Sequence, residues 1–296
     1  MSETVKGRIS LVASMLIFGT IGIFSKHIPL PSGAIALARA VIGIVFLALM
    51  MLMRKKRPSL ASIRKNLIKL LISGVCLGAN WLLFFVACRE TTVPTATLSY
   101  YLAPTFMVLA SALLFKEKIT LSRAAAVLIA LLGMTLASGV IEGGAEGVTL
   151  RGILFGTAAA ALYATVVMTN KTMTDIDVFD KTSVQFAVSA AVLTPYVIFA
   201  EDTSSAAFDL RTVIFILIVG ILHTGIAYAL YFGSANKLPA ATIAVLGYID
   251  PVVSILVSVL FFNEPISALG IIGAVLILGA SLISELPSRK ENKNEN

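Results

Sequence analysis

Three ionisable side chains, Asp250, His223 and Arg39, fall inside long apolar stretches of the sequence. A charged or titratable group at membrane depth is costly, so it needs a partner, a cavity or a function. Asp250 stands directly before Pro251, whose ring removes a backbone donor and loosens the helix. A carboxylate beside freed carbonyls could bind a substrate amine or a proton. Alternatively, it could be paired permanently with Arg39 or cap a helix break.

Arg39 and His223 each allow a structural and a functional interpretation. Arg39 could anchor its helix by reaching the lipid headgroups, or it could hold a substrate carboxylate through two parallel hydrogen bonds. His223 could be a hydrogen-bonded core residue or a titrating relay. Because the chain has only two histidines and two cysteines, we expect no metal site built from the usual soft ligands, and no cofactor.

Aromatic and amide side chains form a second set of candidates. Many lie away from the interface belts in which Tyr and Trp normally collect. Packing between helices and a cavity for a ligand with an apolar or aromatic body both account for them. Together with Arg39, His223 and Asp250, the predicted substrate-contacting residues are Asn80, Trp81, Tyr100, Tyr101, Tyr163, Tyr228 and Tyr248. Tyr248 and Asp250 lie about 200° apart on a helical wheel, so we do not expect both to point at one ligand.

The segments that carry these residues are apolar and long. Of 296 residues, 58% are hydrophobic and 13% are charged, whereas a soluble domain is about 45–50% apolar and about 25% charged. A helix that crosses the bilayer needs about 20 mostly apolar residues. Ten segments qualify and predict an all-α integral membrane protein: 8–26, 33–53, 67–88, 95–115, 121–140, 150–171, 183–200, 211–233, 240–262 and 266–285.

The positive charges predict the orientation of these segments. Lys and Arg in short loops are retained in the cytoplasm. A cytoplasmic N-terminus puts 18 of the 23 Lys and Arg residues on the inner side. We therefore predict a multi-pass plasma-membrane protein with both termini in the cytoplasm. The polar segment 287–296 has no apolar periodicity and is expected to be a disordered cytoplasmic tail.

The chain also resembles itself. Residues 104–120 and 251–267 align without a gap, with thirteen residues from Pro to Glu in each. Five helices are an odd number, so a second copy must enter the membrane upside down. This predicts two inverted five-helix repeats, 1–145 and 146–286, with a substrate site near midplane where they meet. Pro104 and Pro251 occupy equivalent places, and we expect them to break helices that gate each side in turn.

At this point the residues resemble a family, the ten-span EamA-like branch of the drug/metabolite transporter superfamily. The resemblance runs from Arg8 to about Ser284 and rests on the two Pro-to-Glu blocks, on Asp250-Pro251, which is similar to the family's Glu-Pro, and on Arg39 in ALARAVIG. It implies a basket of helices around a central cavity and transport of amino acids, other metabolites or drugs, often outward. Asp250 departs from the pattern, because it is one methylene shorter than the more frequent glutamate.

These observations predict a secondary transporter that exports amino acids or similar small metabolites by alternating access. Efflux of a lipophilic cation is the alternative within transport, since the rings and Asp250 would suffice. A membrane enzyme acting on a lipid-linked substrate would need a nucleophile with its base, or a cluster of acids or histidines, at one interface, and the sequence offers none. The expected partners are a small-molecule substrate, the bilayer and, as a candidate coupling ion, the proton. We expect no nucleic-acid partner, and one chain could work as a monomer.

Overall fold

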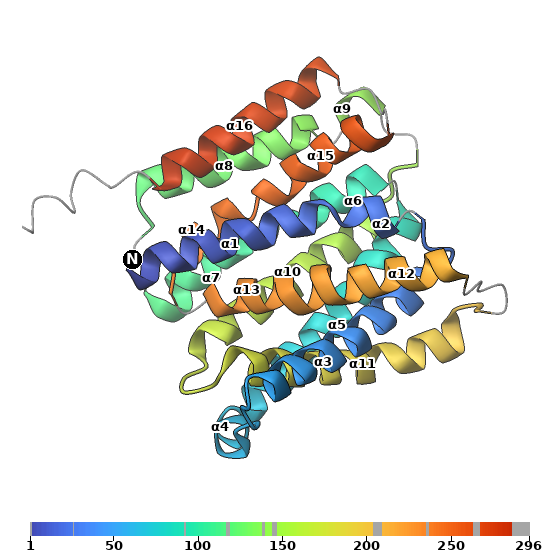
Figure 1. The fold of residues 1–296 in the computed structure, drawn as a ribbon. Helices are drawn as coiled ribbons and strands as arrows, with labels where there is room; N and C mark the ends of the chain where they lie inside the picture. The colour runs from blue at the N-terminus through green and yellow to red at the C-terminus, as the bar shows by residue number, and fades with distance from the viewer. Residues whose placement is uncertain are drawn as a thin grey trace, which may run out of the picture.

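The computed structural model describes residues 2–25, 27–91, 93–116, 119–137, 140–143, 147–203, 209–234, 237–262 and 267–285. Every regular element within these ranges is a helix. The long helices run side by side in one bundle, and the short helix α4 projects from one end of it (Figure 1). The predicted tail, 287–296, lies outside the described residues.

The first half of the chain contains the helices that the apolar pattern predicts, together with shorter ones between them. They are α1 (Glu3–Gly19), α2 (Ile21–Ser25), α3 (Ser32–Met53), α4 (Leu60–Lys65), α5 (Leu67–Glu90), α6 (Val93–Tyr100), α7 (Ala103–Phe115), α8 (Leu121–Ala137) and α9 (Val140–Gly143).

The second half follows the same plan, with one stretch of π-helix. Its elements are α10 (Leu150–Thr172), α11 (Val178–Ala200), α12 (Leu210–Ile218), η1 (Val219–Ile226), α13 (Ala227–Ser234), α14 (Ala240–Leu246), α15 (Ile249–Phe262) and α16 (Ala268–Glu285). The starts of α10, α11 and α12 are fixed by Thr149, Asp177 and Asp209, whose side chains accept hydrogen bonds from backbone N–H groups of the first turn.

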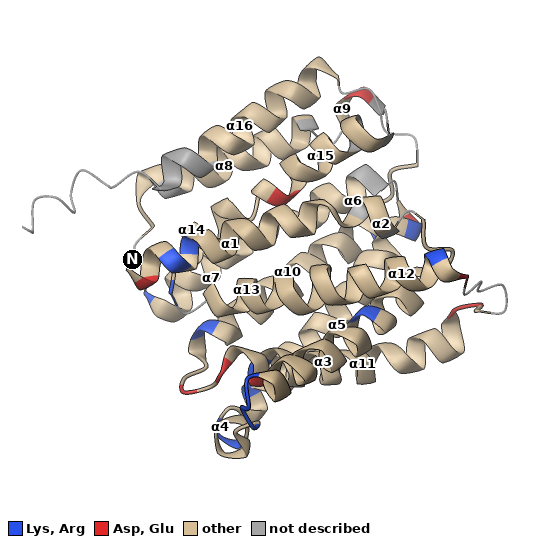
Figure 2. Cartoon of the chain, viewed as in Figure 1, with Lys and Arg blue, Asp and Glu red and all other residues tan. Residues whose placement is uncertain are grey.

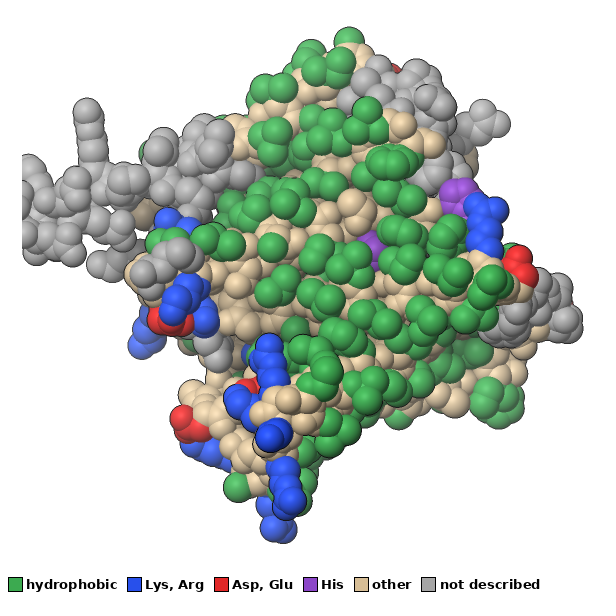
Figure 3. Space-filling view, viewed as in Figure 1, with side chains coloured by type: hydrophobic (Ala, Val, Ile, Leu, Met, Phe, Trp, Pro, Cys, Tyr) green, Lys and Arg blue, Asp and Glu red, His purple; other side chains and the backbone are tan. Residues whose placement is uncertain are grey.

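Six helices in the described part of the chain are long and apolar enough to cross a membrane: 32–53, 67–90, 95–115, 150–172, 178–200 and 210–234. Shorter apolar helices cover 124–136, 240–254 and 268–280. Hydrophobic side chains spread over the middle of the visible face, and charged ones gather towards its ends (Figure 3). The protein is therefore an all-helical, multi-pass membrane protein. Ten crossings in two inverted repeats remain a prediction.

Two of the predicted crossing segments are interrupted just before a proline. Residues 101–102 form a turn between α6 and α7, and residues 247–248 form a turn between α14 and α15. Pro104 and Pro251 then lie in the first turns of α7 and α15, where a missing N–H leaves no helical hydrogen bond unmade. The two breaks are thus short interruptions within otherwise helical stretches, one in each half of the chain.

The helices of the two halves pack against each other along much of their length. α5 packs on α10 and α11, α3 packs on α11, and α8 packs on α16 at one edge of the bundle (Figure 1). At Gly133 in α8, an added Cβ would lie 2.7 Å from the carbonyl oxygen of Gly273 in α16. Such a small residue is needed here because it lets two helix backbones approach closely.

Candidate substrate cavity

A cavity of about 270 Å³ lies inside the bundle, walled by both halves of the chain. Its sides come from α1, α2, α5, α6, α7, α10, α13, α14 and α15, and it includes both helix breaks. The lining residues are Met15, Phe18, Ile21, Phe84, Thr97, Tyr100, Tyr101, Ala103, Pro104, Met107, Tyr163, Tyr228, Tyr231, Ile243, Ala244, Gly247, Asp250 and Ser254.

Aromatic rings dominate the cavity wall. The Tyr163 ring is stacked on that of Tyr231, with centroids 5.9 Å apart, and it lies 6.0 Å from that of Tyr100. On another side, the Phe18 ring meets Tyr228 edge to face at 4.9 Å. Ring faces carry negative electrostatic potential, so such a wall attracts cations as well as apolar groups.

Asp250 is the one charged residue among the described lining residues. It lies in the first turn of α15, beside the break at 247–248, and it interacts with the side chain of Tyr101. The predicted alternative, a permanent pair with Arg39, has no counterpart among the ion pairs of the described residues. The carboxylate is therefore available to a ligand in the cavity.

Arg39 lies in a separate polar cluster behind the cavity wall. Its Nε donates to Thr224 Oγ1 at 3.0 Å, and its guanidinium carbon lies 5.3 Å from the centroid of the Trp81 ring. Trp81 Nε1 donates in turn to the hydroxyl of Tyr228 at 3.2 Å. Since Tyr228 lines the cavity, Arg39 reaches the cavity only through other side chains.

His223 is fully buried in η1 and belongs to the same cluster. Its Nε2 lies 3.0 Å from Thr20 Oγ1, and that hydroxyl also donates to the carbonyl oxygen of Ile17 at 2.7 Å. Thr20 is the C-cap residue of α1, so this ring nitrogen of His223 is already paired with the end of that helix.

The remaining predicted residues connect helices. Asn80 donates from Nδ2 to the carbonyl oxygen of Ala159 at 2.7 Å, which joins α5 to α10. The Tyr248 hydroxyl donates to the carbonyl oxygen of Tyr101 at 3.1 Å, which joins the two helix breaks. Neither side chain lines the cavity, and neither does Pro251.

The predicted residues thus divide into three groups. Tyr100, Tyr101, Pro104, Tyr163, Tyr228 and Asp250 line the cavity; Arg39, Trp81 and His223 form the cluster behind it; Asn80, Tyr248 and Pro251 lie elsewhere. Tyr231, which belongs to the aromatic set of the predicted segment 211–233, also lines the cavity, although it was not among the predicted substrate contacts. Ser254 was not predicted, and helical spacing was the signal that could have found it, because it follows Asp250 by four positions.

A multi-pass helical bundle around an internal aromatic cavity is the architecture of a membrane transport protein. The model of the EamA-like transporter family matches residues 5–139 and 150–285. The chain therefore belongs to the EamA-like transporter family, as its resemblance predicted, and it is a transporter.

Individual proteins agree with this assignment. The chain is 29% identical to the uncharacterized transporter YxxF of Bacillus subtilis (strain 168), over 93% of this chain and 88% of that protein. It is 22% identical to the uncharacterized inner membrane transporter YicL of Salmonella typhimurium, over 98% of both chains. A solved crystal structure superimposes with a TM-score of 0.85 at 20% identity, covering 96% of this chain and 98% of that one, and so shares the fold.

Proposed function

We propose that the protein is a secondary transporter for a small molecule that carries a protonated amine on an apolar or aromatic body. The observation that carries this proposal is the pairing of one carboxylate, Asp250, with a wall of rings. No Lys, Arg or His occurs among the described lining residues. Such a wall favours a cation, because the carboxylate and the ring faces both attract positive charge.

An amino acid remains the second candidate, since its ammonium group meets the same requirement. Its carboxylate would then depend on neutral donors such as Thr97, Ser254 and the tyrosine hydroxyls. Arg39, the predicted partner for that carboxylate, lies behind Trp81. The cavity therefore favours the lipophilic cation, the alternative within transport, over a zwitterion.

Alternating access between two inverted repeats is the proposed mechanism. Two features support it: the family model matches the chain in two stretches, and a helix break precedes a proline in each half. In this proposal the ten predicted segments all cross the bilayer, and the α6–α7 and α14–α15 breaks let the cavity open to each side in turn.

The distribution of Lys and Arg supports an orientation with the N-terminus in the cytoplasm. Lys and Arg gather at the end of the bundle that carries the N-terminus and α4 (Figure 2). Under the positive-inside rule this end faces the cytoplasm. Export of the substrate then means loading at the α4 end and release at the opposite end.

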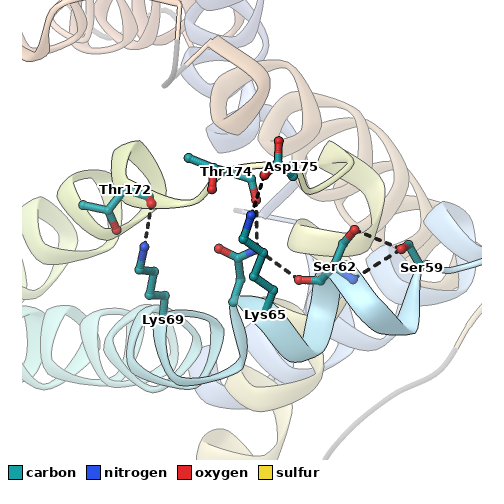
Figure 4. Close-up of polar contacts among 8 residues, drawn as sticks. Ser59, Ser62, Lys65, Lys69, Thr172, Thr174 and Asp175 are labelled. Carbon is teal, nitrogen blue, oxygen red and sulfur yellow. Dashed lines mark hydrogen bonds and ion pairs between the residues drawn. The ribbon is translucent and has the colours of Figure 1, made fainter.

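Polar contacts tie the two halves together at this end (Figure 4). Lys65 Nζ lies 2.5 Å from Asp175 Oδ2, Lys69 Nζ donates to the carbonyl oxygen of Thr172 at 2.6 Å, and Asn66 Nδ2 donates to that of Thr174 at 3.0 Å. We infer that these contacts hold the cytoplasmic end in the conformation described here, and that they change when the transporter turns over.

The test is counterflow in proteoliposomes, with a labelled lipophilic cation and a panel of labelled amino acids, each with and without a pH gradient. Saturable exchange of the cation that is lost in Asp250→Asn and kept in Asp209→Asn is the expected result, because asparagine can still cap α12 at that exposed position. Saturable exchange of amino acids without competition by the cation would instead favour the zwitterion. Cation exchange that survives Asp250→Asn would contradict the role of this carboxylate.

A further inference from the structure

A second hollow, of about 420 Å³, opens between α3 and α11. It shares no lining residue with the substrate cavity. Ile44, Ala48 and Ala187 lie in its apolar part, and Lys56, Asp180 and Ser183 lie at its polar end. The wall of the hollow is therefore mostly apolar along two membrane-spanning helices, and its few polar residues lie at the end beside α4.

The polar end contains buried oxygen atoms without a partner. Asp180 is only 3% exposed, and its Oδ2 accepts a hydrogen bond from the backbone N–H of Ser59 at 3.0 Å. Its Oδ1 and the Oγ of Ser183 have no hydrogen-bond partner among the described residues. A buried carboxylate oxygen without a donor is costly. A hydrogen-bond donor that enters the hollow would remove this cost.

The apolar part opens towards the lipid. Ala187 is exposed on α11, and Leu52, which also lines the hollow, is 71% exposed on α3. Both lie within helices long and apolar enough to cross the membrane, so their exposed surface meets acyl chains. The apolar part is therefore suited to a hydrocarbon chain of the bilayer.

The charge at the mouth of the hollow favours a phosphate. Lys56 Nζ lies 3.1 Å from Asp177 Oδ2 and is 60% exposed, so it has N–H groups left for an outside acceptor. Residues 54–57 read Arg-Lys-Lys-Arg, a cationic run beside the hollow. Such runs at a membrane surface attract lipid phosphates.

We propose that the α3–α11 hollow binds a glycerophospholipid whose headgroup carries both a phosphate and a primary ammonium, as in phosphatidylethanolamine. The phosphate faces Lys56, the ammonium donates to Asp180 Oδ1, and an acyl chain lies along Ile44, Ala48 and Ala187. A phosphatidylcholine headgroup has no N–H to donate. A phosphatidylglycerol headgroup has no positive charge to set against the Asp180 carboxylate.

The test measures lipid binding to the purified full-length chain by native mass spectrometry, with phosphatidylethanolamine, phosphatidylcholine and phosphatidylglycerol of identical acyl chains. We expect phosphatidylethanolamine to bind most tightly, by about tenfold, since one charge-assisted hydrogen bond is at stake. Asp180→Asn should remove this preference, whereas Asp175→Asn, a matched charge change on the same end of the molecule, should keep it.

A second variant covers the case in which Asp180→Asn fails to fold. Ala187→Trp fills the exposed apolar part without changing the polar end, and it should weaken all three lipids while leaving cation counterflow intact. Equal binding of the three lipids to the wild-type chain would overturn the proposal, and so would a preference that survives Asp180→Asn. In those outcomes water satisfies Asp180. Neither depends on whether the cavity transports a cation.

Discussion

The cavity and the polar cluster behind Tyr228 use similar residues in opposite ways. In the cluster, Arg39 contacts Thr224 in η1, and His223 contacts Thr20 at the C-terminal end of α1. In the cavity, Asp250 and several tyrosines face a space large enough for a ligand. An ionisable residue at membrane depth is therefore not by itself a binding site. What distinguishes the two roles is whether the protein supplies the partner.

Removing the cavity carboxylate should give the largest effect. Asp250→Asn is expected to lower the affinity for a cationic substrate by roughly 100-fold, because the partner of a desolvated charge is lost. Binding of a labelled cation to the purified protein measures this directly. Asp250→Glu keeps the charge and should retain part of the affinity. Unchanged affinity in Asp250→Asn would contradict the conclusion that Asp250, unlike Arg39 and His223, is available to a ligand.

A larger side chain between α1 and α15, next to the cavity, should have the second largest effect. At Gly19, an added Cβ would lie 2.5 Å from Val253 Cβ and 2.7 Å from the carbonyl oxygen of Asp250. Gly19→Ala must therefore push α15 away from α1, at a cost of about 1–3 kcal/mol, and the transport rate should fall about tenfold.

The matched control for this prediction is Gly233→Ala. There an added Cβ would meet only Val178 Cγ2, at 3.6 Å, which is an ordinary van der Waals contact. Counterflow with both variants checks the prediction. Equal rates in the two variants would show that α1 does not position the cavity carboxylate.

Breaking the cluster should change stability more than binding. Arg39→Met removes the hydrogen bond to Thr224 and the cation–π contact with Trp81, which together are worth about 1–2 kcal/mol. We expect a lower Tm in detergent and a cation affinity within about threefold of wild type. A selective loss of zwitterion binding would instead make Arg39 a substrate ligand.

The smallest effect is expected at the exposed contact between the halves. The hydrogen bond and charge of Lys65 lower the pKa of Asp175, which lies between α10 and α11. A lowered folded-state pKa stabilises the protein above the ordinary value of about 3.9, and this contribution disappears as the pH falls through the lowered value.

The Tm difference between wild type and Asp175→Asn should therefore be small at neutral pH and vanish in acid. Because the pair is exposed, added salt should also reduce it. A difference that grows as the pH falls would have the wrong sign for this ion pair.

Length and apolar composition were enough to predict where most helices lie, because a membrane leaves few alternatives to a helix. They were not enough to predict the interruptions. The segment predicted as 240–262 is broken at residues 247–248, and the segment 211–233 contains the π-helix Val219–Ile226. The first interruption lies just before Pro251, one of the two prolines expected to break a helix, whereas no residue pattern predicted the π-helix.

Residue type and depth in the membrane were enough to predict which residues could form the site. They were not enough to predict which way each side chain points. Tyr100, Tyr163 and Asp250 line the cavity as their depth suggested. Arg39 lies in an equally apolar stretch of sequence, but its side chain points towards Thr224 and not into the cavity. The rotation of each helix about its own axis decides which side chains meet, and that rotation is set by packing over the whole bundle.

The π-helix η1 sets the register of the helix that follows it. Thr224 donates from its side chain to the carbonyl oxygen of Val219, five residues earlier, within this wider turn. On an α-helix one residue corresponds to a rotation of about 100°. A one-residue deletion that returned η1 to an α-helix would turn α13 by about this angle and carry Tyr228 and Tyr231 off the cavity wall. The position of the aromatic rings on the cavity wall therefore depends on a π-helix that contributes no residue to the described lining.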